Sequence, residues 1–126
     1  MERCRVTISP YESGAYTVVF IGGALNLFTA RDVRAQMEPL LKEERVRVVV
    51  DIEGLDTIDS SGIGALVNFI LAARKHADAR VVFTQPNEIV MRVFEITKLK
   101  SFFEIVDDLE AAKVIILNLN SQGIKS

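Results

Sequence analysis

The sequence has one cysteine and no tryptophan among its 126 residues, and neither sign of charge is in large excess. A single cysteine, Cys4, excludes an internal disulfide and is typical of a protein kept in a reducing compartment. The formal net charge is −2, and no basic stretch is concentrated enough for a nucleic-acid footprint. No apolar run approaches the roughly 18 residues of a membrane span, and MERCRVTISP at residues 1–10 lacks the apolar stretch of a signal peptide. We therefore expect a cytoplasmic protein that binds neither nucleic acid nor membrane.

Residue types that bind metals or activate nucleophiles are also scarce. The only histidine is His76, and no second histidine or cysteine lies close to it in sequence, which argues against a metal site. A serine hydrolase needs G-x-S-x-G at a strand-to-helix turn and a histidine base, whereas this chain has D-S-S-G at such a turn. The tripeptide GIG at residues 62–64 lacks the full dinucleotide-binding pattern and the P-loop lysine. We expect no metal, no cofactor and no enzymatic activity.

What is present is an ordinary globular composition, 49% hydrophobic and 25% charged, at a length that lets one domain bury a core. No repeat or linker interrupts the chain, so we expect a single domain over residues 1–126, with its core at about 4–117 and a frayed tail at 118–126. Alternating or β-branched runs predict strands at residues 4–8, 15–21, 45–52, 79–84 and 101–106. Helical spacing of apolar residues predicts helices at 29–44, 58–74, 85–98 and 107–119. This alternation predicts an α/β fold with a central sheet covered by helices.

A few residues are expected to shape the helix ends. Thr29 can cap the first helix with Asp32 as a box-like partner. Pro39 can kink that helix, and Pro86 suits the first turn of the third one. Apolar residues at helical spacing are expected to face the sheet, namely Val33, Met37, Leu40 and Leu41 on the first helix and Ile89, Val90, Val93 and Phe94 on the third.

The most informative segment is IDSSGIGALVNFILAAR, residues 58–74, which carries no charge between Asp59 and Arg74. One helical stripe is expected to pack on the sheet, namely Ile63, Leu66, Val67, Ile70 and Leu71. The opposite face is expected to present small or uncharged residues, namely Gly64, Ala65, Asn68 and Ala72. Two interpretations stay open for that face. It is either covered or without a role, or it is a flat, uncharged surface on which a partner docks.

Ser60 and Ser61 follow Asp59 at the predicted start of this helix. One interpretation is helix capping, because Ser and Asp side chains both satisfy unpaired N–H groups at a helix N-terminus. The other is phosphorylation, because a helix N-terminus favours anions and could hold a phosphoserine without unfolding the domain. Phosphorylation adds about −1.5 to −2 charges at pH 7. On an uncharged docking face, that charge would repel an acidic group of the partner and require desolvation of a dianion.

The chain resembles the STAS family, and within it the bacterial anti-sigma factor antagonists. The resemblance covers roughly residues 4–117. Its landmarks are GGALNLFTA (22–30), VVVDIEGLDTIDSSGIGALV (48–67) and QPNEIVMRVFEITKLKSFFEIV (85–106). The resemblance implies one α/β domain with a mixed central sheet, about four helices mainly on one face, and no catalysis of its own.

The resemblance also implies a function. Members of this group bind a serine kinase that also holds a sigma factor, and their binding frees the sigma factor. The kinase phosphorylates the first serine of the D-S-S/T-G motif, here Ser60, and a serine phosphatase removes the phosphate. Asp59, Ser61 and Gly62 are then the neighbours of the phosphorylation site.

The loop before the first helix departs from the family pattern. The family often has G-E-L-D where this chain has GALN, so that Ala24 and Asn26 stand at the acidic positions. The resemblance implies that this loop lies near Ser60, so the departure removes negative charge where the phosphate arrives. It could ease phosphorylation, change the partner, or mark a STAS protein outside the sigma-factor pathway. Leu27 and Phe28 in the same loop either add apolar contact area or form a hydrophobic staple ahead of the helix.

The leading hypothesis is a phospho-switched binding module that sequesters a serine kinase while Ser60 is unmodified. Its expected partner-binding residues are Gly64, Ala65, Asn68, Leu27 and Phe28. The main alternative is a STAS module of another regulatory assembly, such as a stressosome-like scaffold or a biofilm or secretion switch. An enzyme with Ser60 as nucleophile is a third hypothesis of a different class, and it lacks a convincing base.

Overall fold

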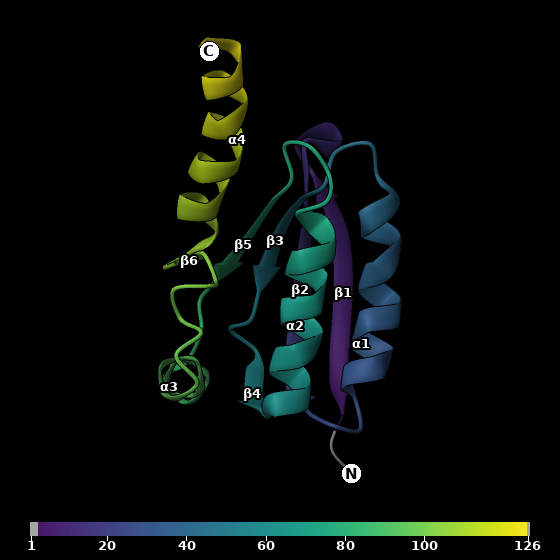
Figure 1. Ribbon diagram of the computed structural model, residues 1–126, viewed down its shortest axis with the longest axis vertical. Helices are drawn as coiled ribbons and strands as arrows, with labels where there is room; N and C mark the ends of the chain where they lie inside the picture. The colour runs from purple at the N-terminus through teal and green to yellow at the C-terminus, as the bar shows by residue number, and fades with distance from the viewer. Residues whose placement is uncertain (1–2, 126) are drawn as a thin grey trace.

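Six strands form one mixed sheet in the computed structural model, which describes residues 3–125 (Figure 1). The strands are β1 (Cys4–Tyr11), β2 (Tyr16–Leu25), β3 (Arg47–Asp51), β4 (Leu55–Ile58), β5 (Arg80–Thr84) and β6 (Ile105–Val106). The α-helices are α1 (Ala30–Met37), α2 (Ser60–Ala73), α3 (Glu88–Ile96) and α4 (Leu109–Lys125). The strand order is β1-β2-β3-β5-β6, with β4 paired to β2. β1 and β2 are antiparallel and the other pairs are parallel, which confirms the predicted mixed α/β fold.

The strand β4 was not predicted from the sequence. It has only four residues, and its two middle residues are exposed, so it lacks both the length and the alternation by which strands are recognised. The connection between β1 and β2 is also shorter than residues 9–14, which the predicted strands leave between them. β1 continues to Tyr11 through Pro10, which an edge strand tolerates because its outer N–H groups need no partner. The connection is a short 3-10 turn, Glu12–Gly14.

A bulge interrupts the pairing of β2 near its end. Residues 17–20 of β2 pair with β3, whereas residues 23–25 pair with β4, and the register shifts between Gly23 and Ala24. Gly23 has φ +92°, and a Cβ atom there would lie 2.1 Å from the carbonyl oxygen of Arg3. Only glycine fits this position without strain. The first part of the predicted GGALNLF loop is therefore the end of a strand, which runs beside β4 to the start of α2.

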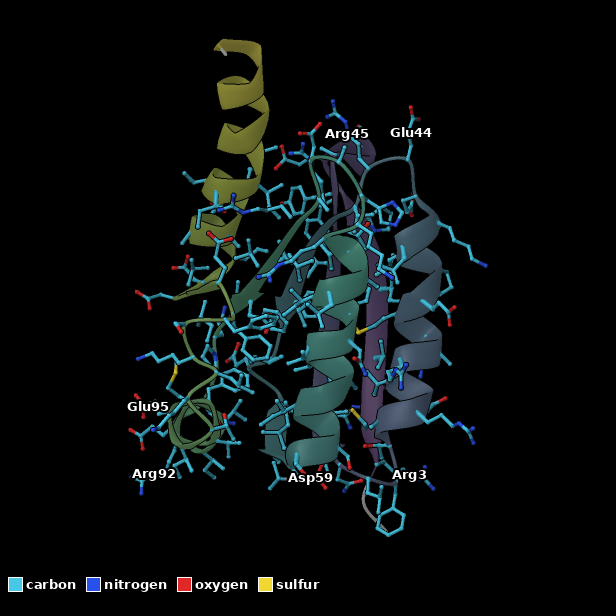
Figure 2. All side chains as sticks on the ribbon, in the orientation of Figure 1. Arg3, Glu44, Arg45, Asp59, Arg92 and Glu95 are labelled. Carbon is cyan, nitrogen blue, oxygen red and sulfur yellow. The ribbon has the colours of Figure 1, made fainter. Side chains whose placement is uncertain are left out.

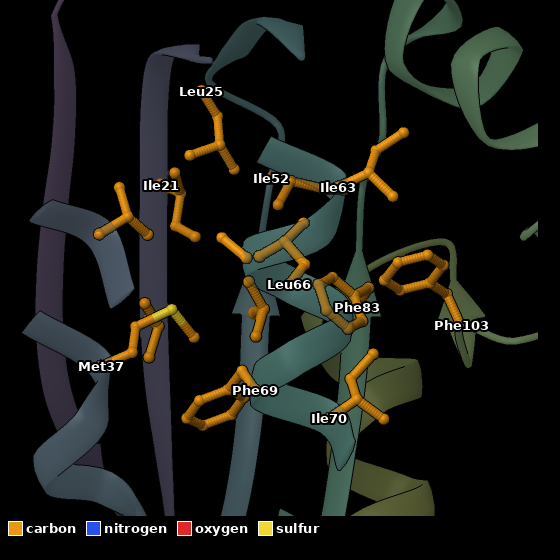
Figure 3. Packing of buried hydrophobic residues seen from close by; sticks show 14 of the residues in the cluster. Ile21, Leu25, Met37, Ile52, Ile63, Leu66, Phe69, Ile70, Phe83 and Phe103 are labelled. Carbon is orange, nitrogen blue, oxygen red and sulfur yellow. The ribbon is translucent and has the colours of Figure 1, made fainter. Parts of the chain in front are cut away.

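Helices cover both faces of the sheet. The larger core lies between the sheet and α1, α2 and α3, and Figure 3 shows part of it. A smaller core lies on the other face, where α4 contributes Ala112 and Ile116. Val48 and Val50 belong to the larger core and Val49 to the smaller one. This explains the continuous apolar run of β3, which was predicted to be a central strand covered on both faces.

Two predictions about helix ends are wrong and one is confirmed. Thr29 precedes α1 but makes no side-chain cap bond, so the Thr29–Asp32 capping box is absent. Pro86 lies before the cap of α3, which is Asn87, whose side chain accepts from the Val90 N–H. The effect of Pro39 is confirmed, because α1 gives way to a 3-10 helix, Glu38–Lys42.

Two further expectations concern α3 and α4. Val90 and Phe94 of α3 are buried as predicted, whereas Ile89 is 59% exposed and does not face the sheet. α4 is helical through Lys125. The predicted frayed tail falls on residues 118–126, whose side chains lie outside the part of the chain that the structure describes.

Candidate functional site

The first turn of α2 is capped by an acid, and not by the serines. Asp59 has an extended backbone, and its Oδ1 accepts from the Gly62 N–H at 2.9 Å. Among the described hydrogen bonds, none involves the hydroxyl of Ser60 or Ser61. Ser60 is exposed, whereas Ser61 is half-buried. Of the two hydroxyls, that of Ser60 is therefore the more accessible, at the base of α2 where Figure 2 labels Asp59.

The loop between β2 and α1 lies against the residue that precedes Ser60. The Asp59 N–H donates to the Leu25 carbonyl at 3.2 Å. The Leu27 N–H donates to Asp59 Oδ2 at 3.1 Å. Leu25 and Ile58 are also partners in the pairing of β2 with β4. These contacts place the GALN loop beside the start of α2, as the resemblance implied.

Asn26 organises this loop from within. Its Oδ1 accepts from the Phe28 N–H at 2.9 Å and from the Thr29 N–H at 3.3 Å. The Thr29 hydroxyl accepts from the Asn26 N–H at 2.9 Å and donates to the Ala24 carbonyl at 2.7 Å. The side chains of Asn26 and Thr29 thus close a compact turn ahead of α1. Ala24 is buried in β2, so of the two non-acidic positions only Asn26 lies in the loop itself.

Leu27 and Phe28 extend outward from this turn. They are 68% and 85% exposed, and Phe28 is the most exposed large hydrophobic residue of the part of the chain that the structure describes. A hydrophobic staple would require the residue before the cap to pack on the following helix. Phe28 is too exposed for that, so the staple interpretation is wrong. The pair is an apolar projection next to Ser60.

The two glycines of the G-I-G sequence have different surroundings. Gly62 is buried, and a Cβ atom there would lie 2.4 Å from the Leu25 carbonyl oxygen and within 2.9 Å of the Ile58 side chain. Nothing lies within 4 Å of a Cβ atom built at Gly64. Gly62 therefore allows α2 to approach β2 and β4 closely, and Gly64 leaves the outer side of the helix flat.

The buried face of α2 is rotated relative to the prediction. Ile63, Leu66 and Ile70 pack in the core as expected, but Leu71 is 47% exposed. Ala65 is only 4% exposed, so its expected position on an accessible docking face is wrong. The reason is that α1 packs beside α2 and covers that side of it, as Figure 1 shows.

The exposed side of α2 is an uncharged ridge. We define the α2 ridge as Ser60, Gly64, Asn68 and Leu71, all at least partly exposed. A shallow groove of about 210 Å³ borders it, and Asn68 lines both the groove and the ridge. The groove lies between α2 on one side and α1 with its 3-10 extension on the other. Its floor includes Ala65 and Phe69 of α2, and Arg34 and Glu38 line the side opposite α2.

Other candidate residues lie away from Ser60 or are unreactive. Burial, with a smaller contribution from Asp32, raises the pKa of the Cys4 thiol to about 11, so the thiol stays protonated. His76 follows the far end of α2, whose 14 residues span about 21 Å, so it cannot act as a base for Ser60. Within the described part of the chain, no three His, Cys, Asp or Glu side chains are grouped to hold a metal ion. No helix among the described residues is long and apolar enough to cross a membrane.

The site therefore belongs to a mixed α/β domain whose helix α2 begins at an exposed serine. A family model of the STAS domain matches residues 7–112, and the chain belongs to the STAS domain family. This finding confirms the resemblance drawn from the D-S-S-G-I-G segment and its flanking landmarks.

Several regulatory proteins are similar to this chain. The anti-sigma-B factor antagonist of Listeria monocytogenes is 28% identical over 87 residues, which are 69% of this chain and 75% of that protein. The crystal structure of an anti-sigma factor antagonist from Mycobacterium paratuberculosis superposes with a TM-score of 0.76 at 14% identity, covering 90% of this chain and 94% of the other. The phosphorylated form of the Bacillus cell fate determinant SpoIIAA gives a TM-score of 0.64 at 17% identity, covering 88% and 99%. At these identities the structural matches show the fold.

Sequence reasoning missed the bond between Asp59 and the loop, and the role of Asn26 in the turn. The role of Asn26 had a local signal, since an Asn placed shortly before a helix commonly accepts from backbone N–H groups two and three residues on. The bond between Asp59 and the loop had no local signal, because Leu27 and Asp59 are 32 residues apart and their contact depends on the pairing of β4, which was not predicted.

Proposed function

We propose that this chain is an anti-sigma factor antagonist that acts in the cytoplasm and binds a serine kinase while Ser60 is unphosphorylated. Its binding displaces a sigma factor from the kinase. The observation that carries the proposal is the exposed Ser60 on the first turn of α2. It begins the uncharged α2 ridge and follows Asp59, which bonds the loop that carries the exposed Leu27 and Phe28. The names of the relatives support the same function.

Phosphorylation of Ser60 ends the interaction. The kinase transfers the γ-phosphoryl group of ATP to Ser60 Oγ. The bond between the γ-phosphorus and the β–γ bridging oxygen breaks, a P–O bond to Ser60 Oγ forms, ADP leaves, and the hydroxyl proton passes to a base of the kinase. The chain gains about −1.5 to −2 charges at pH 7. Two unit charges 4 Å apart interact by about 4 kcal/mol at an effective dielectric constant near 20. The helix N-terminus stabilises the phosphate by about 0.3–2 kcal/mol, so the phosphorylated chain stays folded. The repulsion of an acidic group of the partner is larger, so the complex dissociates.

The binding surface combines the loop and the α2 ridge. Leu27 and Phe28 supply the apolar area, because burying one such side chain at an interface is worth about 1.5–3 kcal/mol. Gly64 and Asn68 let the kinase approach α2 closely without meeting a charge. Ala65 contributes only as buried support beneath the ridge. Asp59, Ser61, Gly62 and Asn26 surround the phosphorylated hydroxyl and shape its setting.

The chain itself is not an enzyme in this proposal. Ser60 has no histidine within reach, since His76 lies beyond the far end of α2. Its hydroxyl is a substrate of the kinase, and a serine phosphatase restores the unmodified state. No metal ion or cofactor takes part on the side of this chain.

The test is phosphorylation by the cognate serine kinase. The purified chain is incubated with ATP and the kinase, and the modified residue is identified by mass spectrometry. We expect one phosphate, on Ser60, and none on Ser60→Ala. Ser61→Ala is the matched control, because it removes the neighbouring, half-buried hydroxyl, and it should be modified as wild type. Phosphate on Ser61 in the wild-type chain would refute the assignment.

A second candidate is a STAS module in another regulatory assembly, and one observation favours it. The chain has Ala24 at the end of β2 and Asn26 in the loop where anti-sigma factor antagonists often carry acids, so the charge near Ser60 differs from that group. A neighbouring kinase gene with a sigma factor gene supports the first proposal. A neighbouring kinase without a sigma factor supports the second, and Ser60 is the phosphorylated residue in both.

A further inference from the structure

Asp59 joins two segments that the proposed function uses separately. Its Oδ1 accepts from the Gly62 N–H at 2.9 Å, which caps α2. Its Oδ2 accepts from the Leu27 N–H at 3.1 Å, which attaches the loop. One carboxylate therefore supports both the turn that carries Ser60 and the loop that carries the apolar projection.

This bond ties the outer part of the loop to α2, beyond Leu25, which accepts from the Asp59 N–H and pairs with Ile58. The hydrogen bonds of Asn26 and Thr29 described above lie within the turn or reach β2, through the Ala24 carbonyl. The Leu27 N–H ties the outer part of the loop to the start of α2. Leu27 and Phe28 are strongly exposed, so their side chains add little packing that would hold the loop in its absence.

We propose that Asp59 is a positioning residue that couples the phosphorylation state of Ser60 to the Leu27–Phe28 loop. While Ser60 is unmodified, the Asp59 carboxylate holds the loop against α2. A phosphate on Ser60 displaces that carboxylate, and the loop is released. The inference rests on the proposed function only in taking Ser60 as the phosphorylated residue.

The physical reason is competition between two anions for the same donors. Asp59 and Ser60 are adjacent, and the N–H groups of the first turn of α2 attract negative charge. A phosphate on Ser60 Oγ has three strong acceptor oxygens and competes for the Gly62 N–H. It also repels the neighbouring carboxylate. The Gly62 N–H exchanges one acceptor for another, whereas the Leu27 N–H loses its acceptor.

This coupling makes phosphorylation act on binding twice. The phosphate repels the partner directly, and the released loop no longer presents Leu27 and Phe28 in a fixed position. A partner that binds the phosphorylated chain must then order the loop again, which lowers its affinity.

The test is amide hydrogen exchange of the isolated chain, measured residue by residue by NMR. Phosphoserine is installed at position 60 during synthesis, so no kinase is needed. We expect the Leu27 amide to exchange at least tenfold faster in the phosphorylated chain, while the Gly62 amide stays protected. Asp59→Asn should give a similar acceleration at Leu27, because an amide can keep the cap acceptor but offers an N–H group in place of Oδ2.

The decisive result is the combination of the two changes. If phosphate acts through Asp59, phosphoserine in the Asp59→Asn chain adds less than twofold to the Leu27 exchange rate. Asp56→Asn is the matched control, because it removes an exposed carboxylate of β4 at the same end of the molecule, and phosphorylation should still accelerate Leu27 exchange tenfold in it. An unchanged Leu27 rate on phosphorylation, or full additivity with Asp59→Asn, overturns the coupling. A kinase that fails to modify Ser60 would instead refute the proposed function, and it leaves the exchange result intact.

Discussion

Replacing Gly62 and Gly64 by alanine, one at a time, should change stability in opposite directions. Both residues lie in α2, and alanine gains up to about 1 kcal/mol over glycine in a helix. At Gly64 nothing opposes that gain, because a methyl group there meets no atom within 4 Å. We expect Gly64→Ala to raise the free energy of unfolding by about 0.5–1 kcal/mol.

At Gly62 the same methyl group would lie 2.4 Å from the Leu25 carbonyl oxygen and 2.8 Å from Leu25 Cγ. The nearest atom is backbone, so either α2 or the end of β2 must shift. Overpacking of this kind costs about 1–3 kcal/mol, and a shift of α2 also strains the bond between Gly62 and Asp59. We expect a net loss of about 1–3 kcal/mol for Gly62→Ala.

Urea denaturation followed by circular dichroism measures both changes, with the shift in midpoint at unchanged slope giving the difference in free energy. Thermal midpoints should move by about 2–8 °C per kcal/mol. A Gly62→Ala chain as stable as Gly64→Ala would show that α2 does not approach β2 as closely as described. The structural explanation of Gly62, the glycine of the D-S-S-G motif, would then be wrong.

Three further outcomes concern binding and phosphorylation. Phe28→Ser should leave the free energy of unfolding within about 0.5 kcal/mol of wild type, because the side chain is exposed. It should weaken kinase binding about tenfold or more in titration calorimetry. Asn68→Arg should fold normally and fail to bind, whereas Ala65→Arg should lose at least about 2 kcal/mol of stability, because Ala65 is only 4% exposed on the floor of the groove between α1 and α2. Asn26→Asp keeps the acceptor of the turn and adds a charge near Ser60, so a phosphorylation time course should be slower at low salt and recover at high salt, with stability nearly unchanged.

Much of the fold could be predicted from the sequence because its elements have clear periodicity. The β-branched run of β3 predicted a strand covered on both faces, and the change of period after Ile58 predicted α2. β4 could not be predicted, because four residues with two exposed positions carry almost no pattern. The bulge at Gly23 lies against the Arg3 carbonyl, just before β1, and such a contact between separate segments carries no local pattern.

The candidate site was predicted in part for the same reason. Ser60 could be singled out because its motif is local, and it is exposed in the structure, while its phosphorylation stays a prediction. Ala65 was misplaced because helical spacing alone does not say which side of α2 a neighbouring helix covers. Asp59 was recognised as a neighbour of Ser60, but its bond to Leu27 depends on tertiary structure that no local pattern encodes.

The affinity of the serine kinase for the chain with and without phosphate on Ser60 tests the central claim most directly. Titration calorimetry at two salt concentrations gives both values, and circular dichroism shows that each form is folded. We predict that the unmodified chain binds and that the phosphorylated chain binds at least tenfold more weakly, with a smaller difference at high salt because the repulsion is screened. Equal affinities for two folded forms would contradict the account.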